Sequence, residues 1–216
     1  MKLLDQEKVK NLVRKYGLTT PKTFLIKNKT ELKKIKKKYF PVVIKIDSPD
    51  IVHKTDAGMV IRAISNKQEL LNAFNRLEAN VKNRFPKAEI TNYVIQEQIR
   101  GYETIIGMKR DPQFGPAIMF GVGGIFVEVL KDVSFRIAPI NKKDAYEMIR
   151  EIKGYKVLNG IRGNRPINFK ALIDILIKIS KISMENKNFK EIDLNPVFVN
   201  EKNAKVVDIR IMVDET

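Results

Sequence analysis

The segment GVGGIFVEVLKDVSFR, residues 121–136, joins a predicted strand at 116–120 to a second predicted strand that begins at Ser134. Its glycines permit positive backbone φ angles and allow backbone N–H groups to approach an anion closely. Arg136 adds a cation that could contact phosphate groups. A cluster of β-turns explains the same glycines about as well, so the segment alone leaves phosphate binding open.

Two familiar nucleotide-binding motifs are missing from the chain. No glycine-rich run ends in Gly-Lys-Ser/Thr, and the glycines at 121–124 are not followed by a further glycine at the dinucleotide-binding spacing. A nucleotide, if bound, must therefore be held by another arrangement.

Hydrophobic periodicity outward from this segment predicts a mixed α/β or α+β fold. Helices are predicted after Asp5, from Thr30, from Ser65 to about Phe85, after Asn141, and from Asn168 to about Asn186. Strands are predicted at 42–46, 58–64, 93–99, 104–109, 116–120, 134–138, 189–199 and 206–213. The change from helical to strand-rich sequence near residue 91 predicts two lobes, 1–91 and 92–216, with a cleft between them.

Composition narrows the function classes. The 216 residues include no cysteine and one histidine, His53, which excludes disulfide scaffolds, zinc ribbons, iron–sulfur clusters and thiol catalysis. Any metal is expected to be a hard cation with oxygen ligands. No apolar run is long enough for a membrane span and the N-terminus lacks a secretory signal, so a cytoplasmic protein without membrane attachment is expected. Abundant Lys and Ile resemble a thermophile's composition.

The formal net charge of +16 raises a nucleic-acid hypothesis. Lysines are spread along the chain, and the dense run at 33–38 is typical of a solvated face. Aromatic residues do not cluster with basic ones as a base-stacking surface requires. Nucleic acid is therefore not the expected partner.

Two basic side chains are candidates for phosphate chemistry. Lys45 interrupts the apolar strand 42–46, where its ammonium could reach a phosphate, although solvent-facing lysines are also common on strands. His53 lies in the polar stretch that follows, and a neutral imidazole can accept and release a phosphoryl group. A plain surface histidine is the alternative.

Acidic and amide side chains mark two further candidate sites. Strand alternation places Glu191, Asp193 and Asn195 on one face, with Asp208 on the partner strand, a set of oxygen ligands that suits Mg²⁺. The stretch from Gln96 to Glu103 could bind an adenine edge through backbone groups and a ribose hydroxyl through a carboxylate. Exposed hairpins explain both stretches without any ligand.

Together and in this order, the motifs resemble those of the ATP-grasp (β) subunit of ADP-forming acetyl-CoA synthetases, relatives of succinyl-CoA synthetase. The resemblance covers nearly the whole chain. It rests on PVVIK (41–45), SP (48–49) leading to HKTD (53–56), residues 121–136, GIRG (160–163) and EIDLNP (191–196). Where the family has paired glycines after the His-Lys loop, this chain has Ala57-Gly58.

The resemblance implies an ATP-grasp fold of two lobes and an acid–thiol ligase that works with a CoA-binding α subunit, expected as an α2β2 assembly. His53 would receive a phosphoryl group and pass it to ADP, with Mg²⁺ and ATP/ADP as cofactors. The nucleotide would be contacted by Lys45 and Arg136 at phosphates, by Glu97, Gln98 and Ile99 at the adenine, and by Glu103 at the ribose. Asn195 and Asp208 would hold the metal.

Two alternatives remain open beside this interpretation. One is the β subunit of a related ATP-grasp acid–CoA ligase, such as succinyl-CoA synthetase. The other is a regulatory domain that binds nucleotide without phosphoryl transfer, and substitution of His53 separates it from the ligase.

Overall fold

The computed structural model describes residues 1–51, 57–124, 131–161 and 163–214. His53 lies outside these residues. The chain forms two compact units, a larger one of residues 1–20 with 100–216 and a smaller one of residues 21–99. This division differs from the expected boundary at residue 91. The first helix belongs to the larger unit, and the strand that begins at Asn92 belongs to the smaller one.

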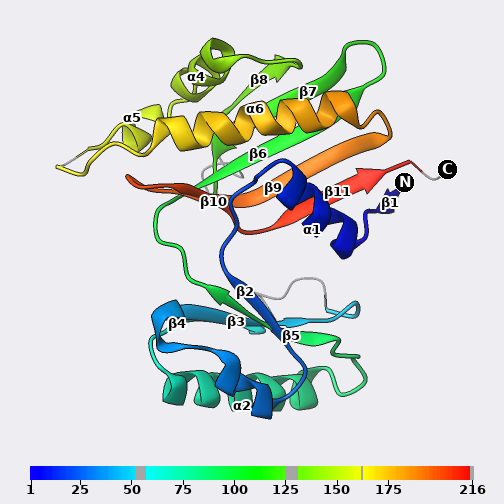
Figure 1. Ribbon diagram of the computed structural model, residues 1–216, viewed down its shortest axis with the longest axis vertical. Helices are drawn as coiled ribbons and strands as arrows, with labels where there is room; N and C mark the ends of the chain where they lie inside the picture. Colours follow the sequence, from blue (N-terminus) through cyan, green and yellow to red (C-terminus); the bar gives the residue numbers. More distant parts are fainter. Residues whose placement is uncertain (52–56, 125–130, 162, 215–216) are drawn as a thin grey trace. The chain divides into compact units, whose positions relative to one another are not determined.

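The smaller unit is a four-stranded antiparallel sheet with one long helix against it (Figure 1). The strand order is β2-β5-β3-β4. Its elements are β2 (Thr23–Ile26), the 3-10 helices η1 (Lys29–Lys34) and η2 (Lys37–Tyr39), β3 (Val42–Asp47), β4 (Val60–Ile64), α2 (Lys67–Arg84) and β5 (Asn92–Glu97). The segment expected to form a helix from Thr30 is the short η1, capped by Asn28.

Burial alternates along β3 because successive side chains of a strand point to opposite faces. Val42, Ile44 and Ile46 are fully buried against α2, whose Phe74 lies in the same core cluster. Lys45 therefore lies on the sheet face opposite α2. Helix α2 is capped by Asn66, whose side chain accepts a hydrogen bond from the backbone N–H of Glu69. The helix therefore begins one residue later than the predicted cap at Ser65 implies.

The larger unit is a seven-stranded antiparallel sheet in the order β1-β11-β9-β6-β7-β8, with β10 paired to β9. Its strands are β1 (Lys2–Leu3), β6 (Tyr102–Asp111), β7 (Gly115–Val122), β8 (Val133–Ile137), β9 (Phe189–Val199), β10 (Ala204–Val206) and β11 (Ile209–Val213). Its helices are α1 (Gln6–Lys15), α4 (Lys142–Glu151), α5 (Tyr155–Leu158) and α6 (Phe169–Glu185).

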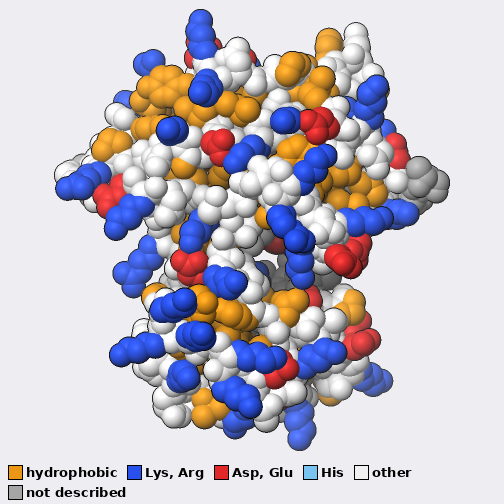
Figure 2. Space-filling view, in the orientation of Figure 1, with side chains coloured by type: hydrophobic (Ala, Val, Ile, Leu, Met, Phe, Trp, Pro, Cys, Tyr) orange, Lys and Arg blue, Asp and Glu red, His pale blue; other side chains and the backbone are white. Residues whose placement is uncertain are grey.

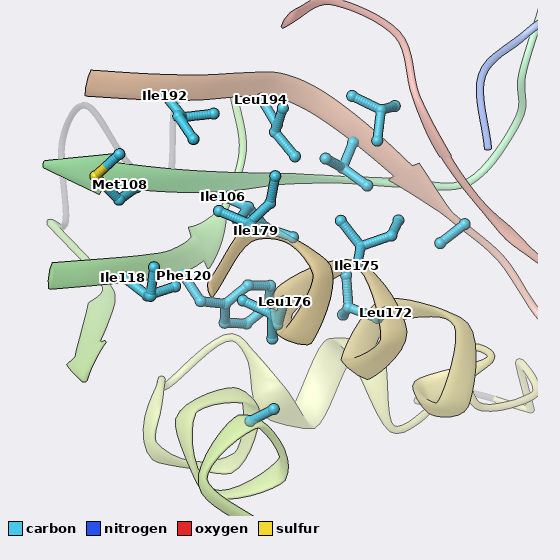
Figure 3. Packing of buried hydrophobic residues seen from close by; sticks show 14 of the residues in the cluster. Ile106, Met108, Ile118, Phe120, Leu172, Ile175, Leu176, Ile179, Ile192 and Leu194 are labelled. Atoms are coloured by element: carbon cyan, nitrogen blue, oxygen red, sulfur yellow. The ribbon is translucent and has the colours of Figure 1, made fainter. Parts of the chain in front are cut away.

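Helix α6 runs along one face of this sheet and supplies much of the core of the larger unit (Figure 1). Leu176 of α6 lies beside Phe120 of β7, and Ile179 of α6 lies beside Ile106 of β6 (Figure 3). The opposite face of the sheet has no helix packed on it in the described chain, so the polar side chains on that face are available for a site.

Several local predictions are confirmed. Asp5, Asn141 and Asn168 each accept backbone N–H bonds at a helix start, as residues with short oxygen-bearing side chains do at N-caps. The mixed α/β fold class is also confirmed. Every helix in the part of the chain that the structure describes is too short or too polar to cross a membrane.

Candidate functional site

The candidate site residues fall into two groups, one in each unit, which are described separately. In the smaller unit, Lys45 is at the centre of β3, with Val60 of β4 and Val94 of β5 directly opposite it. These three side chains share the face that lacks α2. A lysine flanked by two valines on a sheet face can direct its ammonium toward an anion above the sheet while its methylenes pack between apolar neighbours.

The strand end that follows, Glu97 to Ile99, uses its side chains inside the smaller unit. The Glu97 carboxylate accepts a hydrogen bond from the backbone N–H of Lys22 at 3.2 Å. The Gln98 side-chain oxygen accepts one from the backbone N–H of Ala63 at 2.6 Å. Ala63 has a positive φ of 59°, at a register irregularity between β3 and β4. One oxygen of each of these two side chains is therefore bonded to the backbone of the smaller unit.

In the larger unit, the backbones of the two proposed metal ligands, Asn195 and Asp208, are hydrogen-bonded to each other at an irregularity in β9. Thr104 and Ile106 of β6 are two residues apart, but the residues of β9 that pair with them, Val197 and Leu194, are three residues apart. Strand β9 therefore has one extra residue at this point. Such bulges redirect a side chain. Asn195 lies in this extra stretch, and its backbone N–H donates to the carbonyl oxygen of Asp208 at 3.3 Å. The pairing predicted across the terminal strands is thus present.

The Asp208 carboxylate interacts with the two residues that follow it in β11. One oxygen accepts the backbone N–H of Ile209 at 3.0 Å, and the other lies 3.6 Å from Nε of Arg210. Within the described residues, no three or more His, Cys, Asp or Glu side chains gather closely enough to hold a metal ion alone. An amide and a carboxylate suit Mg²⁺, which commonly binds through one or two protein carboxylates and completes its shell with water and substrate phosphates.

Arg210 is the functional candidate that the sequence reasoning missed, and it lies opposite Asp193, which that reasoning included among the oxygen ligands suited to Mg²⁺. They face each other directly across β9 and β11 on the helix-free face. Burial raises the pKa of Asp193, the nearby Arg210 lowers it, and Asp208 and Glu191 raise it further. The alternation that placed Asp193 beside Asn195 could have found Arg210 too, since it lies two residues after Asp208.

Glu103 and the glycines of residues 121–124 are in close contact. The backbone N–H of Gly123 donates to the carbonyl oxygen of Glu103 at 2.7 Å. A Cβ on Gly123 would lie 3.1 Å from the carbonyl carbon and Cβ of Glu103, so a side chain there would require Glu103 to move by a few tenths of an ångström. The Glu103 carboxylate lies near Gly124, 3.8 Å from where a Cβ would be. The glycines therefore allow Glu103 to sit against the turn, and Glu103 shares the helix-free face with Asp193.

Arg136 and Asp132, from the same central segment, have different surroundings. Arg136 points to the helix-covered face, where its guanidinium pairs with Glu151 of α4 at 2.8 Å. The structure does not bring it to the face that carries Glu103 and Asp193. Asp132 accepts the backbone N–H groups of Lys153 and Gly154 at 2.8 and 2.7 Å, so its carboxylate stabilises the turn after α4.

The larger unit thus combines a carboxylate beside a glycine turn, an amide and a carboxylate on backbone-paired residues, and a half-buried aspartate opposite an exposed arginine. Such an arrangement can bind a metal–nucleotide complex: oxygen ligands for the cation, a carboxylate for a sugar hydroxyl and a guanidinium for charge compensation.

Comparison with known proteins agrees with this geometry. The family model of the ATP-grasp domain matches residues 1–213. The β subunit of acetate–CoA ligase (ADP-forming) I from Pyrococcus furiosus is 47% identical over 212 residues, which cover 97% of this chain and 91% of that protein. Acetate–CoA ligase (ADP-forming) I of Archaeoglobus fulgidus is 46% identical over 93% of this chain, which spans 29% of that longer protein.

Solved structures of the Ca. Korarchaeum cryptofilum dinucleotide-forming acetyl-coenzyme A synthetase 1 are also similar. Its complex with coenzyme A, Ca-AMPCP and HgCl⁺ has a TM-score of 0.89 and 43% identity, covering 99% of this chain and 94% of that chain. Its complex with coenzyme A and Mg-AMPPCP, with the phosphohistidine segment pointing towards the nucleotide-binding site, has a TM-score of 0.84 and 40% identity, with 99% and 93% covered. The match to the family model, the sequence identity and the shared fold together show that this chain belongs to the ATP-grasp family of ADP-forming acetate–CoA ligase β subunits.

Proposed function

We propose that this chain is the nucleotide-binding β subunit of an ADP-forming acetyl-CoA synthetase that works with a separate CoA-binding α subunit. The carrying observation is the grouping of Glu103, Asn195 and Asp208 on one helix-free sheet face of a chain 47% identical to such a subunit. This face supplies the oxygen ligands that a magnesium nucleotide requires.

The reaction begins in the α subunit, where phosphate attacks the thioester of acyl-CoA and displaces CoA to give acyl phosphate. A histidine of that subunit then attacks the phosphorus of acyl phosphate, the carboxylate is released, and a phosphohistidine forms. An imidazole nitrogen of His53 then attacks the phosphorus, and the P–N bond to the α subunit's histidine breaks. In the last step a terminal phosphate oxygen of ADP attacks the same phosphorus, the P–N bond to His53 breaks, and ATP forms. Every step is reversible, so the enzyme also runs from ATP to acyl-CoA.

The residues of the chain bind and orient the nucleotide for this transfer. Lys45 neutralises phosphate oxygens, the backbone of Glu97, Gln98 and Ile99 binds the adenine edge, and Glu103 accepts the ribose hydroxyls. Asn195 and Asp208 hold the cation, which when bound supplies charge compensation at the transferred phosphoryl group.

Arg136 takes no part in our proposal for the nucleotide, because its guanidinium is paired with Glu151 on the other face of the sheet. Arg210 is the better candidate for charge compensation, since it lies beside Asp208 and opposite Asp193. Arg210→Met should therefore weaken binding of Mg-ADP more than Arg136→Met does, as measured by calorimetric titration.

Labelling with γ-³²P-ATP and Mg²⁺, with and without a candidate α subunit, tests the relay directly. The expected product is an acid-labile, base-stable phosphoryl group on His53 that is absent from His53→Ala. Binding of Mg-ADP without any label under either condition would refute the relay and favour a regulatory nucleotide-binding domain. Acetate and succinate are then compared as substrates of the reconstituted complex to identify the acid.

A further inference from the structure

Strand β8 lies at one end of the larger sheet, beside α4 (Figure 1). Among the described residues it pairs with β7 alone, over five consecutive residues and without a register shift. On the helix-covered face, Ser134 donates to the carbonyl oxygen of Met148, and Arg136 pairs with Glu151. Within the described chain, the outer backbone edge of β8 is therefore available to another strand.

The other three side chains of β8 are apolar and share the helix-free face, because side chains alternate along a strand. Phe135 is 56% exposed and Ile137 is 48% exposed, whereas Val133 is half-buried. The β7 residues opposite Phe135 and Ile137 are Met119 and Ala117, so the apolar surface continues onto the neighbouring strand. Contiguous apolar surface of this kind is typical of a protein–protein contact.

The sheet edges formed by β1, β2 and β4 are protected against strand addition, and β8 is not. β1 has only two residues, one of them a lysine. β2 is flanked by the exposed Lys22 and Lys27, and β4 has a register shift and the exposed Arg62. Short strands, charges and bulges are the devices that natural sheets use at their edges. β8 has regular pairing, no lysine or proline, and an arginine whose charge is paired with α4.

The charge around β8 fits a second copy of the same chain. The net charge is +16, and Lys and Arg side chains (blue) are spread over the visible face of the molecule (Figure 2), so two copies repel each other unless they meet where charge is balanced. At β8 the charges cancel, since Lys131 and Arg136 are matched by Asp132 and Glu151. An acidic partner would gain nothing from this neutral edge, whereas a second copy avoids repulsion there.

We propose that β8 pairs with β8 of a second copy of this chain, in antiparallel orientation about a two-fold axis at Phe135. This register gives the longest overlap of two five-residue strands and keeps the helix-free faces of both sheets on the same side. Phe135 lies opposite Phe135 of the second copy, and Val133 lies opposite Ile137 of the second copy. The two pairs of Arg136 with Glu151 meet on the other face as a charge-balanced group. The strand thus has the self-complementarity that a two-fold contact requires.

Cysteine crosslinking tests the contact and its register, because the chain has no cysteine of its own. On the proposed axis the two Cα atoms of residue 135 lie about 4.5–5.5 Å apart, within the range of a disulfide, whereas those of residue 137 lie about 13 Å apart along the strands. Under mild oxidation the full-length Phe135→Cys protein should form a disulfide-linked dimer, and Ile137→Cys should not. Met184→Cys, at a side chain of α6 that is 44% exposed, is the control and should also stay uncrosslinked.

Sedimentation velocity of the full-length chain over a range of concentrations measures the association without any crosslink. We expect a dimer that Phe135→Lys and Ile137→Lys each weaken at least about tenfold, because a lysine on an edge strand opposes strand addition. Met184→Lys should associate as the wild type does. Added salt should strengthen the dimer by screening the repulsion between two chains of charge +16. Melting temperatures close to that of the wild type show that the lysine variants remain folded.

The outcomes separate a second copy from other occupants of the edge. A chain that stays monomeric at every concentration, or a dimer equally strong in Phe135→Lys and Met184→Lys, overturns the proposal. A monomeric chain whose binding to the α subunit is lost in Phe135→Lys also overturns it and assigns the edge to that subunit. Equal crosslinking of Phe135→Cys and Ile137→Cys refutes the register. The inference does not rest on the proposed function, since none of these readouts uses nucleotide or phosphoryl transfer.

Discussion

Arg110 should be among the largest single contributors to the stability of the larger unit. Its guanidinium, on β6, donates to three backbone carbonyls: Nε to Phe189 at 2.8 Å, and Nη2 to Ser183 at 2.5 Å and Asn186 at 3.1 Å. These carbonyls belong to the end of α6 and the start of β9. One side chain thus joins the helix that covers the sheet to the strand that carries Asp193 and Asn195.

Arg110→Met keeps most of the aliphatic side chain and removes all three donors. At about 1 kcal/mol for each hydrogen bond, the loss of free energy of unfolding is about 3 kcal/mol. For a chain of this size, 1 kcal/mol corresponds to about 2–4 °C, so the melting temperature should fall by about 6–12 °C. Arg110→Lys, whose ammonium cannot reproduce the planar fork, should recover only part of the loss.

Differential scanning calorimetry measures the effect without requiring a tryptophan, which the chain lacks. The matched control is Arg136→Met, which breaks one ion pair to the half-exposed Glu151 and should cost at most about 1 kcal/mol. The reasoning is refuted if Arg110→Met melts within 2 °C of Arg136→Met, or if Arg110→Lys is as stable as wild type.

Three further predictions test other parts of the structure. Asp208→Ala should weaken Mg-ADP binding at least about tenfold, since a carboxylate ligand is worth more than 1.4 kcal/mol, and unchanged affinity in calorimetric titration would exclude it from the metal site. The Tyr16 hydroxyl donates to the Glu185 carboxylate at 2.6 Å and lowers the pKa of that carboxyl below 4.5. The stability that this hydrogen bond contributes is therefore present above pH 4.5 and is lost as the pH falls through the lowered pKa. Tyr16→Phe should therefore be less stable than wild type at pH 7 with a difference that narrows at pH 3, and a pH-independent difference in urea unfolding would contradict this. Gly154→Ala would place a Cβ 2.5 Å from Cγ2 of Val122 and should cost about 1–3 kcal/mol, mostly recovered when Val122→Ala is added; additive losses would rule out the steric explanation.

Local features of the chain were predictable because their causes are local. Asp5, Asn141 and Asn168 cap the helices that follow them, since a short oxygen-bearing side chain can satisfy N–H groups only two or three residues away. The alternation that placed Glu191, Asp193 and Asn195 on one face of β9 follows from the two-residue period of a strand. The sequence therefore determined most of the longer elements, the fold class and the pairing of Asn195 with Asp208, but not the short β2 and α5.

Other features depend on contacts between distant residues, which no local pattern specifies. The first helix joins the larger unit because β1 pairs with β11 about 210 residues later, and β5 joins the smaller unit because it pairs with β2 and β3. Arg136 carries a charge suited to phosphate, yet the pleat of β8 turns it toward Glu151 of α4. The pairing of Arg210 with Asp193 across β9 and β11, and the hydrogen bonds from α2 to Ala57 and Gly58, likewise join residues that are far apart in the sequence. Only the tertiary structure decided all of these outcomes, because each depends on which elements pack side by side.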